Sequence, residues 1–375
     1  MDSDSSDDYY ALKKRVKTEK KPCPYMKTVN RYLLDFDFEK VCSVTLSNTN
    51  IYACLVCGLY FQGRGKGSPC YTHSVDKQHH VFLNVLDEKA YCLPDDYEIE
   101  DDSLDDIRFN LNPKFTDLDN IPTSALSLTG VEYIPGIVGL NPVRSNSYMS
   151  ASIHALSILV PFRDKLLASG GPGLSHLMKK IWNYQNFKGI VSPLEFVHLV
   201  SKESGKVFYT ESNDPMKFLK WIISRAGDGL FAFFELNLPE TPVFKSDNKD
   251  LFIPTVELRD LLHVGDTKAN GYLVMHINRF IQNDFFLEKN SSIVRFPLRG
   301  LNVEGTSYRL VAVICHEGEK IESGTRPSCI SGKFVAYVMH PKTQQWYKCD
   351  GLRITKVLPQ SVAIVESYVL VWERE

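Results

Sequence analysis

Cysteine residues are concentrated near the start of this 375-residue chain, with histidines among them. Six of its nine cysteines lie in residues 23–92, where a Cys54-Leu-Val-Cys57 pair is followed by His73 and the pair His79-His80. Two sulfurs in a C-x-x-C turn can bind one tetrahedral zinc ion, and two downstream histidines can complete a closed structural site. The alternative is that the cysteines are small buried residues and the histidines are polar surface groups. The spacing favours a zinc-stabilised module.

A second informative stretch runs from Gly139 to Leu156. Its second half places Met149, Ile153 and Leu156 at helical spacing, so we expect a helix that begins near Ser147. Backbone N–H groups and the positive end of the helix dipole converge at a helix N-terminus, which suits a nucleophile. The alternative is that Ser147 or its neighbour only caps the helix.

The composition is that of an ordinary globular protein, with 43% hydrophobic and 23% charged residues. The formal net charge of −2 argues against a surface that binds polyanions indiscriminately, so we expect protein partners more than bare nucleic acid. No apolar run approaches the length needed to cross a bilayer, and the first residues lack the apolar core of a signal peptide. We therefore expect an intracellular protein with no membrane partner, whose clustered cysteines bind metal instead of forming disulfides.

The chain divides into four predicted regions. Residues 1–22 form a disordered charged tail, in which an acidic block precedes a basic run that could act as a nuclear-import signal. Residues 23–94 contain the cysteine/histidine module. Residues 95–134 form an acidic linker, because residues 95–106 hold eight acids and no base and should stay solvated. Residues 135–375 form one large domain.

The large domain is predicted to be helical first and rich in strands afterwards. Ser192-Pro193-Leu194-Glu195 has the pattern of a capping box with proline at the first helical position. Asp214-Pro215 begins another helix, which Gly227 ends. Strands are predicted at residues 230–236, 271–280, 293–296, 308–316, 334–340 and 368–373. Helices followed by an antiparallel sheet make an α+β domain.

The cysteine/histidine module resembles the zinc finger of the ubiquitin-specific-protease (UBP) type. The Cys57-Gly58 step, Tyr60-Phe61 and the segment Val81-Phe82-Leu83-Asn84 carry the resemblance. It implies a zinc cofactor whose ligands are Cys54, Cys57, His73 and His79. Cys42 is an alternative to one of these four ligands, and Cys23 and Cys92 could contribute to a second metal site.

The resemblance also bears on what the finger binds. In family members that hold the free C-terminus of ubiquitin, an arginine follows the Cys-Gly pair and aromatic residues complete the pocket. Here Leu59 follows Gly58, and a leucine cannot pair with a carboxylate. Tyr91 retains one aromatic position. We therefore expect a structural or protein-binding finger that does not read ubiquitin tails.

The large domain resembles the ubiquitin-specific proteases. The matching segments are Gly139-Leu140 with Tyr148-Met149, then 272–280, 308–318, 346–350 and 368–372. This resemblance implies a papain-like fold with a helical thumb and a β-sheet palm and fingers. Matched residue by residue, the four working positions hold Ser145 for the oxyanion-stabilising Asn, Ser147 for the catalytic Cys, Lys333 for the catalytic His, and Asp350 for the orienting carboxylate.

These substitutions predict a domain without protease activity. A Ser147–Lys333 dyad would need a neutral lysine, which requires a pKa drop of about three units through burial without a counter-charge. If Asp350 lies where the family carboxylate does, it instead holds Lys333 in an ion pair that fills the old cleft. His276 and His340 fall within strand patterns and are interpreted as structural histidines, whereas His316 is left unassigned.

The finger and the altered domain together resemble the inactive ubiquitin-specific-protease-like splicing factors of the U4/U6.U5 tri-snRNP. The resemblance implies a nuclear, non-enzymatic scaffold in pre-mRNA splicing that contacts tri-snRNP proteins and associates indirectly with small nuclear RNA. Two alternatives remain open. One is an adaptor that binds ubiquitin or a ubiquitin-like protein weakly, and the other is an active deubiquitinase that uses Ser147.

Overall fold

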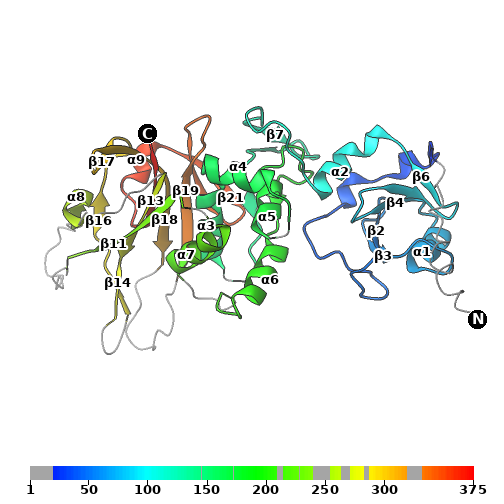
Figure 1. Ribbon diagram of the computed structural model, residues 1–375, viewed down its shortest axis with the longest axis horizontal. Helices are drawn as coiled ribbons and strands as arrows, with labels where there is room; N and C mark the ends of the chain where they lie inside the picture. The colour runs from blue at the N-terminus through cyan, green and yellow to red at the C-terminus, as the bar shows by residue number, and fades with distance from the viewer. Residues whose placement is uncertain are drawn as a thin grey trace, which may run out of the picture. The chain divides into compact units, whose positions relative to one another are not determined.

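The computed structural model describes residues 20–144, 146–171, 173–208, 214–227, 229–239, 254–262, 271–282, 287–318 and 332–375 (Figure 1). The chain forms two compact units, residues Met1–Leu111 and Asn112–Glu375. The predicted tail lies outside the described residues up to position 19. No helix in the described ranges has the length and apolar character needed to cross a membrane.

The first unit is built on a six-stranded sheet with strand order β1-β6-β5-β4-β2-β3. The strands are β1 (Lys20–Lys21), β2 (Ile51–Cys54), β3 (Tyr60–Gln62), β4 (Val81–Asn84), β5 (Ala90–Cys92) and β6 (Tyr97–Ile99). Helix α1 (Pro69–Lys77) begins where the Ser68 side chain accepts a hydrogen bond from the Tyr71 N–H at 3.3 Å. The small core includes Phe61, Phe82 and Leu93.

Residues 95–111 belong to this first unit and not to a solvated linker, which differs from the expectation. They form β6, the short 3-10 helix η3 (Asp102–Leu104) and α2 (Asp105–Leu111). The apolar side chains of Ile99, Ile107 and Leu111 are buried. Arg31 also pairs with Asp106. The acids lie on the outside of this segment while its few apolar residues pack inward, a division that acid counting alone does not reveal.

Helices α3 (Ser147–Ser157), α4 (Val160–Ala168), α5 (Leu174–Ile181), α6 (Leu194–Glu203) and α7 (Pro215–Ala226) begin the second unit and gather on one side of its sheet (Figure 1). The predicted start and end of α7 are confirmed, since Asp214 accepts a hydrogen bond from the Met216 N–H at 2.7 Å and Gly227 adopts φ 60°. The predicted helix after Ser192 is present, but Pro193 is the N-cap of α6 and not its first helical residue, and this proline makes no side-chain cap hydrogen bond.

The main sheet of the second unit has the order β11-β13-β22-β18-β19-β20-β21, with β17 paired to β18. Its strands are β11 (Phe231–Asn237), β13 (Tyr272–Asn278), β17 (Leu301–Val303), β18 (Thr306–Glu317), β19 (Lys333–Met339), β20 (Trp346–Asp350), β21 (Arg353–Val357) and β22 (Ser367–Arg374). The expectation of a purely antiparallel sheet is wrong, because β11 runs parallel to β13.

Smaller elements complete the second unit. They are β7 (Ala125–Leu126), β8 (Glu132–Tyr133), β9 (Gly139–Leu140), β10 (Ile190–Val191), β12 (Thr255–Glu257), α8 (Leu258–Leu261), β14 (Phe280–Gln282), β15 (Leu287–Lys289), β16 (Ile293–Arg295) and α9 (Pro359–Val362). Strand β9 pairs with β10, and the Leu140 N–H donates to the Gly351 carbonyl at 3.0 Å. This bond fixes the segment before α3 against the turn after β20.

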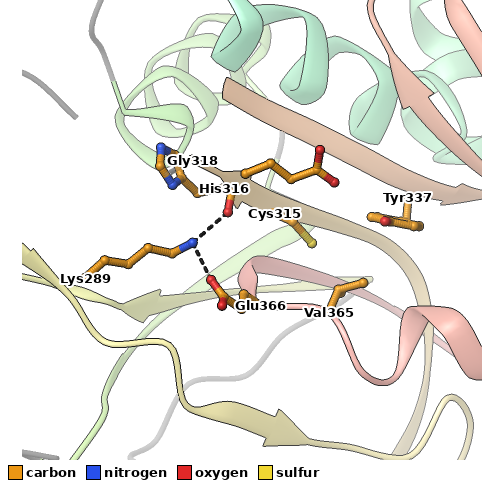
Figure 2. Close-up of a pocket in the computed structure, with 8 residues that line it drawn as sticks. Lys289, Cys315, His316, Gly318, Tyr337, Val365 and Glu366 are labelled. Carbon is orange, nitrogen blue, oxygen red and sulfur yellow. Dashed lines mark hydrogen bonds and ion pairs between the residues drawn. The ribbon is translucent and has the colours of Figure 1, made fainter. Parts of the chain in front are cut away.

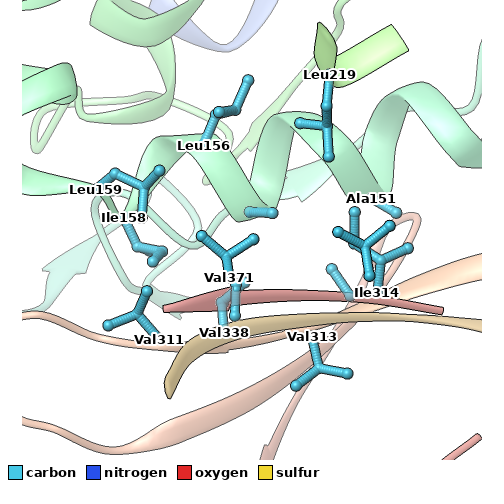
Figure 3. Packing of buried hydrophobic residues seen from close by; sticks show 14 of the residues in the cluster. Ala151, Leu156, Ile158, Leu159, Leu219, Val311, Val313, Ile314, Val338 and Val371 are labelled. Atoms are coloured by element: carbon cyan, nitrogen blue, oxygen red, sulfur yellow. The ribbon is translucent and has the colours of Figure 1, made fainter. Parts of the chain in front are cut away.

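The core of the second unit lies between α3 and the sheet (Figure 3). Ala151 of α3 faces Ile314 of β18 in this layer, and Val313 points to the opposite face of the sheet, as strand alternation requires. Both Ala151 and Ile314 are at most 2% exposed. Helix α3 is therefore held along its length by the sheet, and its N-terminus is fixed beside the strands that carry Lys333 and Asp350.

Candidate metal centre and candidate catalytic cleft

The structure brings Cys54, Cys57, His73 and His79 together. One ligand atom from each lies within 4.8 Å of the others. The Cys54 Sγ is 3.5 Å from His79 Nδ1, the Cys57 Sγ is 3.5 Å from His73 Nε2, and the two nitrogens are 3.0 Å apart. No other such group of three or more metal-ligating side chains occurs among the described residues.

These distances fit a tetrahedral zinc ion. Bond lengths of about 2.3 Å to sulfur and about 2.0–2.1 Å to nitrogen place sulfur about 3.5 Å from nitrogen and the nitrogens about 3.3 Å apart. The donor set of two thiols and two imidazoles is one that zinc prefers. The residues present therefore fit a zinc ion, in agreement with the zinc cofactor expected from the sequence.

The backbone around Cys57 explains how this turn forms. Gly58 adopts φ 77°, and its N–H donates to the Cys54 carbonyl at 2.9 Å. A Cβ at this position would lie 2.1 Å from the Leu33 carbonyl oxygen, so only glycine fits. On the histidine side, Gln78 ends α1 in the left-handed conformation and turns the chain so that His79 meets His73.

The two thiols differ in acidity. The hydrogen bond with Cys54 is the main cause that lowers the pKa of Cys57 to about 5, and interactions with His79 and His73 act in the same direction. The same hydrogen bond, together with burial, raises the pKa of Cys54. One sulfur is therefore poised as a thiolate, and a bound metal would supply the charge needed to deprotonate the second.

The remaining cysteines of the first unit lie apart from this group. The Cys42 Sγ accepts hydrogen bonds from the N–H groups of Val44 and Thr45, both at 3.4 Å. The Cys23 and Cys92 thiols interact with each other and with the Tyr97 hydroxyl. The structure does not bring a third metal-ligating side chain to this pair among the described residues.

A basic residue that the sequence interpretation missed lies beside Tyr91. The Arg64 guanidinium stacks over the Tyr91 ring at 4.3 Å from its centroid and pairs with Asp96. Leu59, the residue after the Cys-Gly pair, is 49% exposed. Arg64 comes from the Gly-rich turn at residues 63–67. It is not a sequence neighbour of Tyr91, and the fold brings the two side chains together.

Ser147 lies at the first position of α3, where the sequence placed it. Its Oγ accepts a hydrogen bond from the backbone N–H of Phe334 at 3.0 Å. Asn146, the N-cap, is buried and makes no side-chain cap. Its Oδ1 has no hydrogen-bond partner. Ser145, the residue at the predicted oxyanion position, lies outside the described residues.

Lys333 and Asp350 form the ion pair that the sequence suggested. Lys333 Nζ is 2.6 Å from Asp350 Oδ2, with side chains 48% and 29% exposed. An ammonium has no lone pair with which to accept the Ser147 proton. The hydroxyl of Ser147 is thus positioned by a main-chain N–H instead of a base.

The histidines of the sheet have structural surroundings. His276 Nδ1 lies 2.5 Å from a carboxylate oxygen of Glu235, whose other oxygen is 2.6 Å from Lys220 Nζ. His340 Nδ1 accepts backbone hydrogen bonds from Lys342 and Thr343 at 3.3 and 3.2 Å. His316 is buried and its ring contacts Phe334 at 5.0 Å.

Comparison with known proteins gives two family matches. Residues 42–104 match the family described as "Zn-finger in ubiquitin-hydrolases and other protein". Residues 138–372 match the family described as "Ubiquitin carboxyl-terminal hydrolase". The two matches contain the candidate metal centre and the candidate cleft, respectively.

Individual proteins match nearly the whole chain. "Ubiquitin carboxyl-terminal hydrolase 39" of Homo sapiens is 34% identical, over 100% of this chain and 84% of that protein. "Probable mRNA-splicing protein ubp10" of Schizosaccharomyces pombe is 32% identical, over 93% of this chain and 88% of that protein. The solved structure titled "Crystal structure of an essential yeast splicing factor" superposes with a TM-score of 0.82 at 28% identity, covering 94% of this chain and 99% of that one.

Proposed function

Because the chain belongs to the ubiquitin carboxyl-terminal hydrolase family, with a zinc finger of the ubiquitin-hydrolase type before the hydrolase domain, we propose that it is a non-enzymatic scaffold in pre-mRNA splicing. It acts in the nucleus and assembles or stabilises the U4/U6.U5 tri-snRNP through protein–protein contacts. Relatives named as splicing proteins, matched over nearly their whole length, support the splicing role.

The proposal that the chain lacks protease activity rests on the residues at the candidate catalytic positions. A hydroxyl stands where the family thiol is expected, and its hydrogen-bond partner is the Phe334 N–H. Lys333 is paired with Asp350 and cannot take up a proton. Acyl transfer needs a nucleophile and a base within hydrogen-bond reach, and losing one oxyanion donor alone costs about 10²–10³ in rate.

The absence of catalysis is tested with ubiquitin that carries an electrophile at its C-terminus. We expect the full chain to remain unmodified while an active ubiquitin-specific protease is labelled under the same conditions. The variant Ser147→Cys combined with Lys333→His restores the thiol and the imidazole and is the matched comparison. A covalent adduct on Ser147 of the unmodified chain, located by mass spectrometry, would contradict the proposal.

The scaffold role is tested by purifying the tagged chain from nuclear extract. We expect small nuclear RNAs and tri-snRNP proteins to be co-isolated, with the RNA lost when the protein contacts are disrupted by salt. Recovery of the chain without any small nuclear RNA would refute the splicing role. This outcome is independent of the labelling experiment, so the two parts of the proposal fail separately.

Cys54, Cys57, His73 and His79 are proposed to hold one zinc ion that stabilises the finger. When bound, the ion supplies a rigid tetrahedral link between β2, the following turn and α1. We expect Cys57→Ser to lower the zinc content of the purified chain, measured by atomic emission. Cys70→Ser is the matched control, because Cys70 is buried but is not part of the ligand group. Equal zinc in both variants would refute the assignment.

The second candidate is a weak ubiquitin-binding adaptor, and the Arg64–Tyr91 stack is the observation that favours it. A guanidinium stacked on an aromatic ring can pair with the C-terminal carboxylate of ubiquitin, but here Arg64 already forms an ion pair with Asp96. Titration with ubiquitin, and with ubiquitin lacking its last two glycines, separates this candidate from a scaffold without ubiquitin affinity. Binding that requires the glycines and is lost in Arg64→Ala would establish it.

A further inference from the structure

The guanidinium of Arg279 is completely buried at the junction of β13 and β14. Its Nε donates to the Ser367 carbonyl at 2.6 Å, and Nη1 donates to the carbonyls of Asn290 and Ser292 at 2.9 and 2.7 Å. One side chain thus joins its own segment to one that lies 11 to 13 positions away and to another that lies 88 positions away. The three segments are the end of β13, the connection between β15 and β16, and the start of β22.

Three buried polar atoms at this junction have no hydrogen-bond partner. They are Arg279 Nη2, Ser292 Oγ and Ser367 Oγ. Both serines are 0% exposed, and the carbonyl of each contacts the same guanidinium. A buried polar group that is left unpaired destabilises the fold, because it has lost its hydrogen bonds to water. All three groups can donate a hydrogen bond, and the guanidinium can only donate, so the missing partner is an acceptor.

The local charge balance is positive. No carboxylate lies within ion-pair distance of Arg279 in the part of the chain that the structure describes. Glu366 is near enough to raise its pKa, but Glu366 already pairs with Lys289. Burial is the main effect on the Arg279 pKa and lowers it to about 10. Among the described residues, two cations and one anion therefore leave one positive charge without a counter-ion.

A pocket borders this site. It has a volume of about 320 Å³, and its lining includes Lys289, Cys315 and Glu366 (Figure 2). Lys289 Nζ donates to the His316 carbonyl at 2.8 Å and reaches Glu366 across the pocket (Figure 2). Cys315 and Glu366 both interact electrostatically with Arg279. Lys289 and Glu366 of the pocket lining are the chain neighbours of Asn290 and Ser367, whose carbonyls accept hydrogen bonds from the guanidinium.

We propose that Arg279, Ser292 and Ser367 form a binding site for one small monovalent anion of the halide class, chloride under cellular conditions. An anion accepts all three leftover hydrogen bonds and neutralises the buried charge. A water molecule would accept only two of them and would leave the charge in place. The bound anion stabilises the junction of the three segments.

The test compares the thermal stability of the full zinc-loaded chain in sodium chloride and in sodium gluconate at equal ionic strength. Gluconate is too large for a fully buried site. We expect the unfolding temperature to rise with chloride and to saturate, because a ligand that binds only the folded state stabilises it by mass action. In the double variant Ser292→Ala, Ser367→Ala, the chloride concentration that gives half of the rise in unfolding temperature should increase at least about 10-fold. This is the order expected when two hydrogen bonds to an ion are lost.

Ser152→Ala is the matched control, since Ser152 is also 0% exposed but its Oγ donates to the Tyr148 carbonyl at 2.8 Å. This variant should keep the full chloride effect. Crystals grown in bromide should show anomalous density in contact with Arg279. Equal stability in the two salts would overturn the proposal. So would a double variant that is more stable than the unmodified chain in both salts, because removing unpaired hydroxyls from an empty site relieves their burial cost.

Discussion

Acidification should destabilise the second unit through two buried histidines. His154 on α3 and His340 after β19 are each 1% exposed, and burial is the main cause that lowers the pKa of both to about 4. An unfolded chain titrates its histidines near pH 6.5, on the order of 2.5 units higher. As the pH falls below about 6.5, the unfolded state binds protons that the folded state does not, so stability is lost toward acid. The loss stops growing near pH 4.

The magnitude follows from these values. One pKa unit corresponds to about 1.4 kcal/mol, so each histidine removes about 2 kcal/mol of stability at pH 5 and about 3 kcal/mol at the acid limit. Two such groups acting independently remove about 4 kcal/mol at pH 5. Typical domains are stable by about 5–15 kcal/mol, so the second unit should approach unfolding at pH 5.

Tryptophan fluorescence is a suitable assay, because all four tryptophans of the chain lie in the second unit. Loss of zinc from the first unit in acid is therefore silent in this signal. We expect urea midpoints of the unmodified chain to fall between pH 7 and pH 5, and His154→Leu to reduce this fall by about half, since it removes one of two equal contributions. His198→Leu, an exposed position on α6, is the control.

The reasoning would be refuted by a His154→Leu variant whose stability falls with pH as steeply as that of the unmodified chain. It would also be refuted by His198→Leu flattening the pH dependence as much as His154→Leu. Either result would mean that other groups dominate the acid response, and that burial of the imidazole at α3 does not control protonation.

Three further outcomes are expected. Gly136→Ala should lower the free energy of unfolding, measured by urea titration, by about 3 kcal/mol or more, because its Cβ would lie 2.5 Å from the Trp182 ring. Gly130 has a similar positive φ but open space around it, so Gly130→Ala should lower the free energy of unfolding by less. Asp350→Ala and Lys333→Ala should each change stability by less than about 1 kcal/mol, because both side chains of this ion pair are partly exposed to solvent; a loss of several kcal/mol would show that the pair is buried in solution. Chelation of zinc should unfold the first unit by circular dichroism without changing tryptophan fluorescence, and a fluorescence change would contradict separate cores.

Local patterns predicted the parts of this fold that depend on neighbouring residues. The start and end of α7 follow from Asp214, Pro215 and Gly227, because a cap and a helix stop are local hydrogen-bond and backbone effects. The position of Ser147 at a helix N-terminus follows from apolar spacing in the same way. The four residues proposed as zinc ligands were found from spacing and resemblance, since a C-x-x-C turn and two nearby histidines already restrict where a metal can lie.

Contacts between segments that are distant in sequence could not be predicted from local sequence patterns. The parallel pairing of β11 with β13 depends on how the chain crosses between them, which strand patterns do not encode. Arg64 reaches Tyr91 across 27 positions, and the Phe334 N–H reaches Ser147 across 187. The acidic segment from residue 95 to 111 packs on the finger because its few apolar side chains are buried.

The sequence, with its family resemblance, therefore proposed the composition of both sites. It predicted which residues stand at the nucleophile, base and metal positions, and that Lys333 pairs with Asp350. Only the tertiary structure decided the partners of those residues, including the main-chain N–H that holds Ser147 and the unpaired guanidinium face of Arg279. The physical reason is that hydrogen bonds act over about 3 Å, whereas the residues they join here are separated by tens to hundreds of positions that only chain packing brings together.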